Sequence, residues 1–207
     1  MSLAKRRPTA FIVVLLGILA LGVVAIVATS QQDGPDDDAT ATARVTVEGD
    51  PLPAFAGGST DEATGMQAPE VTGRDFDGSA VRIVEDTRPK AIVFLAHWCP
   101  HCQREVGDLT AWLEDNELPK GVDLYTVSTF ADPTRGNYPP DRWLSDAGWS
   151  FPVLVDDEES SVAEAFGLAG TPFWVFTAGD GTVVGRSSGA LEPEQLEQLL
   201  RELAKAQ

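Results

Sequence analysis

The fold is decided by the stretch Ala91-Ile-Val-Phe-Leu-Ala-His-Trp-Cys-Pro-His-Cys-Gln-Arg-Glu-Val106. It begins with an apolar run, rich in β-branched residues, that ends at Trp98. After a Cys-Pro-His-Cys box the pattern changes, and Cys102, Val106, Leu109 and Leu113 recur with the period of one face of a helix. The sequence therefore predicts a buried strand that leads into a helix whose first turn carries two thiols.

The two thiols of this box indicate redox chemistry. Cys99 and Cys102 lie three positions apart at a helix start, so a disulfide between them needs little backbone movement. The unpaired N–H groups and the dipole of the helix favour a thiolate there and lower its pKa. We expect Cys99, at the very start of the helix, to be the nucleophile, and the more shielded Cys102 to resolve the mixed disulfide.

The neighbours of the two cysteines are expected to tune this chemistry. Pro100 suits a first helical turn, where its missing N–H would have no partner. A protonated His101 would place positive charge beside the Cys99 sulfur, which stabilises the reduced form and makes the site more oxidising. Trp98 is expected to pack over the site as an apolar shield, with an ordinary core tryptophan as the alternative. No role is assigned to His97.

Glu105 is a candidate proton carrier. It follows Cys102 by one helical turn, on a face that otherwise points inward. A buried carboxyl group there would have a raised pKa and would exchange protons with Cys102. The alternative is an ordinary exposed glutamate.

The chain resembles the thioredoxin superfamily. The resemblance rests on Trp98-Cys99-Pro100-His101-Cys102, on Glu105, and on Gly170-Thr171-Pro172 further along, and it covers roughly residues 67 to 207. Within the superfamily the chain is most similar to the membrane-anchored TlpA-like and ResA-like branch, although DsbA-like oxidants share its Cys-Pro-His-Cys box. The resemblance implies an α/β thioredoxin-like fold, in which a central mixed sheet is flanked by helices.

The resemblance also assigns further site residues. Glu105 matches a glutamate that belongs to the site of ResA-like proteins. Pro172 would be a cis proline facing the dithiol, and the backbone of Thr171 would bind an extended substrate. An ordinary trans proline at a strand start is the alternative. Val93 departs from thioredoxins proper, which usually carry a buried aspartate there.

The N-terminal part of the chain predicts a membrane anchor. Lys5-Arg6-Arg7 precede an apolar stretch over residues 10–28, about long enough to cross a hydrocarbon core of ~30 Å. We assign residues 1–30 to a transmembrane anchor whose N-terminus is cytoplasmic, which places the rest of the chain outside. A cleaved signal peptide is the alternative.

After this anchor, residues 31–66 are expected to form an acidic flexible linker, and residues 67–207 the folded domain. A short strand around Val45 and Val47 is not favoured. Within the domain we expect strands over residues 70–76, 79–84, 90–96, 122–127, 151–155, 173–176 and 183–186. Helices are expected over residues 99–114, from 139 to about 148, over 158–166, and from 193 onward.

These features predict an extracytoplasmic, membrane-tethered thiol–disulfide oxidoreductase. Its substrates would be proteins with thiols or disulfides, and its electron partner another membrane protein. The formal charge of −17 argues against nucleic acid. The anchored architecture suggests a reductase and the His101 argument an oxidase, so the direction stays open.

No cofactor beyond a Cys99–Cys102 disulfide is expected, and no metal. Zinc needs four ligands, and the only histidines are His97 and His101. A Cu(I) metallochaperone is the alternative function, because soft thiolates suit that ion. Met66 is the only methionine besides Met1, so methionine-rich arms are missing.

Overall fold

The computed structural model describes residues 45–58 and 60–205. All of them belong to one compact unit, residues 41–207. The predicted anchor over residues 1–30 lies outside the described residues. Within the part that is described, no helix is both long and apolar enough to cross a membrane.

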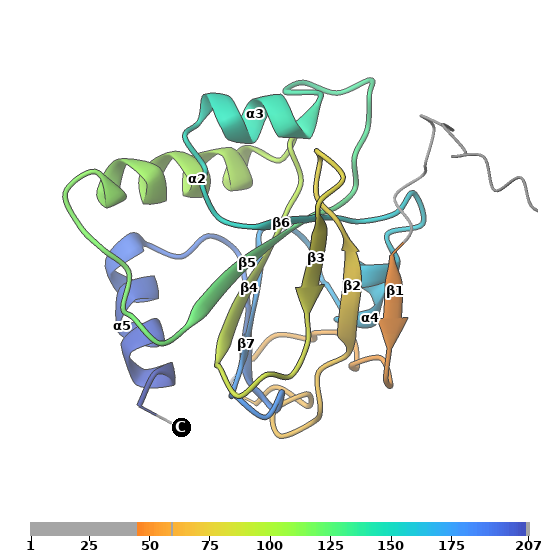
Figure 1. Ribbon diagram of the computed structural model, residues 1–207, viewed down its shortest axis with the longest axis vertical. Coiled ribbons are helices and arrows are strands. Elements are labelled where there is room, and N and C mark those ends of the chain that lie inside the picture. The colour runs from red at the N-terminus through yellow and green to blue at the C-terminus, as the bar shows by residue number, and fades with distance from the viewer. Residues whose placement is uncertain (1–44, 59, 206–207) are drawn as a thin grey trace, which may run out of the picture. The chain divides into compact units, whose positions relative to one another are not determined.

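A five-stranded mixed sheet forms the centre of the domain, with the order β6-β5-β4-β7-β8 (Figure 1). The strands are β4 (Lys90–Leu95), β5 (Asp123–Ser128), β6 (Val153–Val155), β7 (Phe173–Thr177) and β8 (Val183–Ser188). β5 runs parallel to β4 and β6 parallel to β5, whereas β7 and β8 are antiparallel additions. This mixed pairing confirms the predicted sheet.

The alternation of side chains along β4 divides the core into two layers. Ala91, Val93 and Leu95 pack on the face covered by α2 (Pro100–Leu113) and α5 (Pro193–Leu203). Ile92 and Phe94 point to the other face, where the short helix α4 (Ser161–Ala165) packs. Figure 1 shows α2 and α5 on one side of the strands and α4 on the other. Because both faces are covered, every residue of β4 is buried, as its continuous apolar run predicted.

The helices begin where proline favours a first turn. α2, α5 and α3 (Pro140–Asp146) each have a proline at the first or second helical position. In α5, Leu196, Leu200 and Leu203 are buried, and they recur with the period of one face of a helix. α4 begins at Ser161, three residues later than expected.

A second, three-stranded antiparallel sheet precedes β4 in the chain. Its order is β1 (Thr46–Glu48), β2 (Glu70–Arg74), β3 (Ala80–Ile83). The predicted hairpin between β2 and β3 is present. Gly78, which has a φ of +87°, lies in the turn, and the Asp75 carboxylate accepts hydrogen bonds from the backbone of Asp77 and Ser79.

The expectation of a flexible linker over residues 31–66 is wrong for its second half. β1 pairs with β2, Leu52 is buried, and its N–H donates to Ala165 O at 2.8 Å. The Asp61 carboxylate forms an ion pair with the buried guanidinium of Arg186. Residues 45–66, apart from the undescribed residue 59, therefore pack on the domain, which starts earlier than residue 67. They are held by backbone hydrogen bonds, by one ion pair and by the isolated buried side chains of Leu52 and Ala63, which leave no apolar periodicity in the sequence.

Candidate functional site

The first cysteine of the box occupies the N-terminal end of α2. Cys99 is the N-cap, with an extended backbone (φ −77°, ψ 118°), and Pro100 follows in the first turn. Both cysteines are free thiols in the structure. Cys99 is 6% exposed, whereas Cys102 is fully buried one turn further on. The more accessible sulfur is thus the one expected to be the nucleophile.

The segment around Pro172 lies against this sulfur. The Cys99 thiol donates a hydrogen bond to Thr171 O, with 3.2 Å between the sulfur and the oxygen. The Thr171–Pro172 peptide bond is cis, as the resemblance implied. The fold thus brings the dithiol together with two residues that lie far away in the chain.

The surroundings give the two thiols different proton affinities. Burial acts to raise the pKa of Cys99, but hydrogen bonds with the Cys102 N–H, with the Thr171 side chain and with the Cys102 side chain outweigh it. The net result is a lowered pKa for Cys99. Burial raises the pKa of Cys102 to about 12. Near neutral pH, therefore, Cys99 is the thiol that forms a thiolate and Cys102 keeps its proton.

Glu105 lies in the interior and is 2% exposed, which excludes the alternative of an exposed glutamate. Its Oε1 accepts hydrogen bonds from the Trp174 indole N–H at 2.7 Å and from the Leu191 backbone N–H at 2.9 Å. Its Oε2 is buried and has no hydrogen-bond partner among the described residues. Burial raises the pKa of Glu105 to about 7, although the two donors act in the opposite direction. The carboxyl group can therefore gain and lose a proton near neutral pH.

His101 contacts a second basic side chain in the first turn of α2. His101 is exposed, and its Nδ1 accepts a hydrogen bond from the Arg104 guanidinium. The Arg104 guanidinium therefore adds positive charge to the first turn of the helix, beside His101. His101 itself acts on Cys99 through a backbone hydrogen bond that helps to lower the thiol pKa.

Trp98 is half-buried and packs at the edge of the apolar cluster below α2. Its indole N–H donates to Phe130 O at 2.8 Å, and the Arg135 guanidinium lies 3.7 Å above its ring. This is a tryptophan held in a fixed orientation beside the dithiol, not an ordinary core residue.

His97 is a site residue that sequence reasoning missed. It is 1% exposed, its Nδ1 lies 2.8 Å from Gly136 O, and its Nε2 accepts from the Asp132 N–H at 3.1 Å. These partners set the tautomer, with the proton on Nδ1. His97 thereby fastens the segment between β5 and α3 to the end of β4. Only its place at the end of a buried strand, one residue before Trp98, hinted at this in the sequence.

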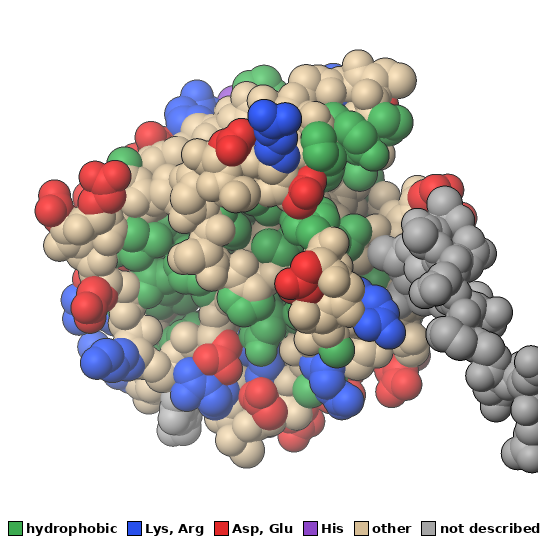
Figure 2. Space-filling view, turned by 45° about the horizontal axis from the view of Figure 1, so that its top comes forward, with side chains coloured by type: hydrophobic (Ala, Val, Ile, Leu, Met, Phe, Trp, Pro, Cys, Tyr) green, Lys and Arg blue, Asp and Glu red, His purple; other side chains and the backbone are tan. Residues whose placement is uncertain are grey.

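The charges on the surface do not form a nucleic-acid site in the view of Figure 2, where Lys and Arg alternate with Asp and Glu. Among the described residues, no group of three or more His, Cys, Asp or Glu side chains is placed to hold a metal ion.

Solved structures share this fold. The chain is similar to a putative thiol:disulfide interchange protein DsbE from Chlorobium tepidum, with 19% identity and a TM-score of 0.57, covering 70% of this chain and 99% of that one. It is also similar to a secreted Mycobacterium tuberculosis disulfide oxidoreductase, with 20% identity and a TM-score of 0.52. That match covers 70% of this chain and 100% of the other. StoA from Bacillus subtilis is 17% identical to this chain, with a TM-score of 0.51. The match covers 60% of this chain and 91% of StoA.

A family model described as a thioredoxin-like domain matches residues 76–204, which is more than half of the chain. The chain therefore belongs to the thioredoxin-like family.

Proposed function

We propose that this protein is a membrane-anchored thiol–disulfide oxidoreductase that exchanges disulfides with protein substrates outside the cytoplasm. The observation that carries the proposal is the 3.2 Å contact between the Cys99 sulfur and Thr171 O, directly before a cis proline. The contact joins the more exposed of the two thiols, at a helix N-terminus, to a backbone carbonyl next to which we expect an extended client chain to pair.

The exchange proceeds in two balanced steps. The Cys99 thiolate attacks one sulfur of a client disulfide, so that a Cys99–client bond forms and the other client sulfur leaves as a thiolate. Cys102 then loses its proton and attacks the Cys99 sulfur. The Cys99–Cys102 disulfide forms, the second client thiol is released, and two electrons have passed to the client. The reverse sequence oxidises a client dithiol.

Glu105 serves the second of these steps. Cys102, whose pKa is about 12, reacts only after it has lost its proton. Glu105, buried one turn away with a pKa of about 7, is ionised in a large fraction of molecules at neutral pH and accepts that proton. Thr171 and Pro172 bind the client backbone, while Trp98, Pro100 and His101 keep the Cys99 surroundings in place. The dithiol is the only redox group that this mechanism uses.

The cellular setting of the proposal rests on the N-terminal sequence. The apolar stretch over residues 10–28 anchors the chain with the dithiol domain on the outer side, where disulfides persist. Another membrane protein restores the redox state of the dithiol after each cycle. The similarity to a secreted disulfide oxidoreductase supports this placement.

Reduction of insulin disulfides by the purified full-length chain, with dithiothreitol to reduce the dithiol again after each cycle, tests the proposal. We expect turnover with the natural sequence, none with Cys99→Ser, and an accumulated mixed disulfide on Cys99 with Cys102→Ser. Turnover by Cys99→Ser would contradict the assignment. The reduction potential then gives the direction, since a value of about −120 mV indicates an oxidant and about −270 mV a reductant.

A further inference from the structure

The segment 129–139, which connects β5 to α3, is bound tightly to the end of β4 that carries the dithiol. His97 holds it through Gly136 O and the Asp132 N–H, and the Trp98 indole N–H holds it through Phe130 O. The Asn137 side chain returns a hydrogen bond to His97 O at 3.3 Å. This loop is therefore a preformed surface next to Cys99.

This rigid loop exposes two aromatic side chains. Phe130 is 39% exposed and Tyr138 is 50% exposed, and both are among the few large apolar side chains that the described part of the chain leaves open to solvent. Phe130 also has a φ of +53°, in the left-handed region that non-glycine residues disfavour. Phe130 thus combines a strained backbone with an exposed aromatic ring. Strained residues and exposed apolar groups both concentrate at functional surfaces.

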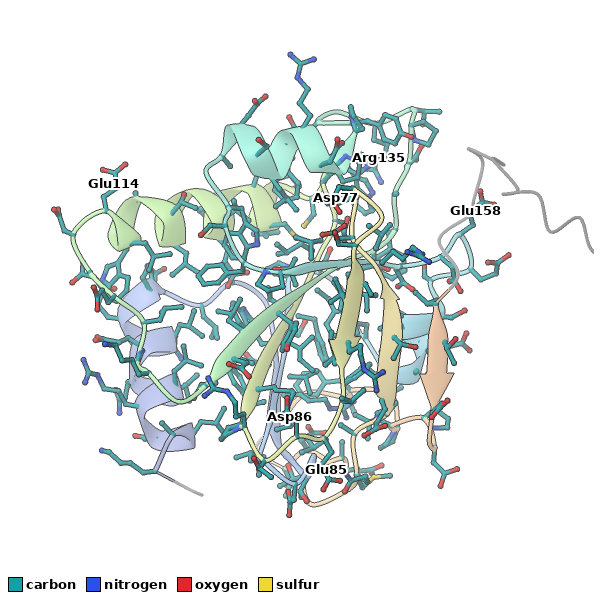
Figure 3. The ribbon with its side chains drawn as sticks, in the orientation of Figure 1. Asp77, Glu85, Asp86, Glu114, Arg135 and Glu158 are labelled. Carbon is teal, nitrogen blue, oxygen red and sulfur yellow. The ribbon has the colours of Figure 1, made fainter. Side chains whose placement is uncertain are left out.

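Phe130 and Tyr138 contact the two residues that directly precede Cys99: Phe130 O accepts from the Trp98 indole, and the Tyr138 ring lies 5.7 Å from the His97 ring. Trp98 directly precedes Cys99, and its ring is held between the loop backbone at Phe130 and the guanidinium of Arg135. In Figure 3, Arg135 lies close to α3, at the end of the sheet away from Glu85 and Asp86. A client whose sulfur is bonded to Cys99 must place the residues that flank its cysteine over this end of the molecule.

We propose that Phe130 and Tyr138 form a docking rim for an unfolded client segment that carries an apolar side chain next to its disulfide cysteine. This inference rests on the proposed function and adds the class of client. Two fixed aromatic rings supply contact area at little entropic cost, because the hydrogen bonds to His97 and Trp98 have already ordered the loop. Folded proteins bury most of their large apolar side chains, so the rim selects unfolded or misfolded clients.

The test compares three disulfides with the full-length, reduced chain. Two are peptides that are identical except for Phe or Ser beside each cysteine, and the third is the small neutral hydroxyethyl disulfide. The measured quantity is the second-order rate constant of the single turnover for each peptide, divided by that for hydroxyethyl disulfide. We expect the Phe peptide to exceed the Ser peptide by about 10-fold or more, the effect of burying one large apolar side chain.

Variants then locate this preference. Phe130→Ser combined with Tyr138→Ser should lower the Phe-peptide ratio by about 10-fold. Phe130→Leu combined with Tyr138→Leu keeps apolar side chains at both positions and should retain most of that ratio. Met66→Ser is the matched control, because Met66 is 36% exposed. Its carbonyl bonds to Val183, and the strand register links Val183 through Thr177 to Lys90, at the far end of β4 from Cys99. The control should keep the ratio of the natural sequence.

The outcomes separate the two proposals. The docking rim would be refuted if the natural sequence gave equal ratios for both peptides. It would also be refuted if the Ser/Ser variant kept both the Phe preference and the unfolding temperature of the natural sequence. In either case the exchange activity would stand. A chain that reacts with none of the three disulfides would overturn the proposed function and the rim together.

Discussion

At the scale of single residues, the site depends on three proton affinities that burial and hydrogen bonding set differently. Cys99, Cys102 and Glu105 lie within two turns of one helix, yet the pKa of Cys99 is lowered while those of the other two are raised. The separation follows from position, since the N-cap sulfur reaches the free N–H groups and the inner side chains do not.

The difference between the two thiols predicts selective alkylation. At pH 7 the lone thiol of Cys102→Ser should react with iodoacetamide at least about 100-fold faster than the lone thiol of Cys99→Ser, because only the thiolate is nucleophilic. Mass spectrometry of timed samples measures both rates. In guanidinium chloride the rates should converge, since unfolding removes both environments. Similar rates in the folded proteins would contradict the roles given to the two sulfurs.

The indole of Trp174 is expected to set the proton affinity of Glu105. Its N–H donates to Oε1, and a donor favours the ionised carboxylate, so Trp174→Phe should raise the pKa of Glu105 above about 7. The expected rise is about one to two pH units, the effect of losing one hydrogen bond to a charged group. Carbon NMR of labelled glutamate carboxyl groups across a pH titration measures it.

The matched control for this measurement is Trp149→Phe. Trp149 is also a buried indole of the same apolar cluster, but its N–H donates to Thr126 Oγ1 at 2.9 Å and not to Glu105. We expect no change in the Glu105 titration for this variant. An equal rise in both would show that general loosening of the core, not the lost donor, changes the carboxyl group.

At the scale of elements, the segment before β2 is the part that the sequence concealed. Its contacts join residues far apart in the chain, such as Leu52 with Ala165 and Asp61 with Arg186. Neither contact produces a local pattern. The strand–helix unit at β4 and α2 was predictable because its apolar period is local and continuous. For the same reason the burial of Glu105 was predictable, but its donors on Trp174 and Leu191 were not.

Arg186 is expected to fasten this segment to the main sheet. Its side chain is fully buried, and it donates to both carboxylate oxygens of Asp61, to Pro53 O and to Phe166 O. Arg186→Met leaves the Asp61 carboxylate and two carbonyls without their partner, so the free energy of unfolding should fall by roughly 3–5 kcal/mol. Denaturant unfolding followed by tryptophan fluorescence measures the loss.

Arg201→Met provides the control for that loss. Arg201 pairs with Glu197 on the surface of α5, where its side chain is 59% exposed. An exposed ion pair one helical turn apart contributes about 0.3–0.5 kcal/mol. If the two variants were equally stable, residues 45–66 would not be held through Arg186.

At the scale of the whole molecule, the buried carboxyl group of Glu105 lowers the free energy of unfolding once it ionises. Ionised Glu105 is disfavoured by burial, so its pKa rises from 4.5 to about 7 on folding. Between these two values the unfolded chain has released the proton while the folded chain retains it. The contribution of Glu105 to the free energy of unfolding therefore falls as pH rises through this window and becomes level above it.

This linkage gives the last prediction, for the reduced full-length chain. From pH 4.5 to about 7 the contribution of Glu105 to the free energy of unfolding should fall by about 3 kcal/mol, because each pH unit between the two pKa values is equivalent to about 1.36 kcal/mol. Glu105→Gln keeps an oxygen for Trp174 and Leu191 but does not ionise, so its curve should lack that fall and lie about 3 kcal/mol higher at pH 8. Glu114→Gln, at the exposed end of α2, should follow the natural sequence (Figure 3). Parallel curves for all three chains would mean that the Glu105 carboxyl ionises equally well in the folded and unfolded protein, and that it is no proton carrier tuned to neutral pH.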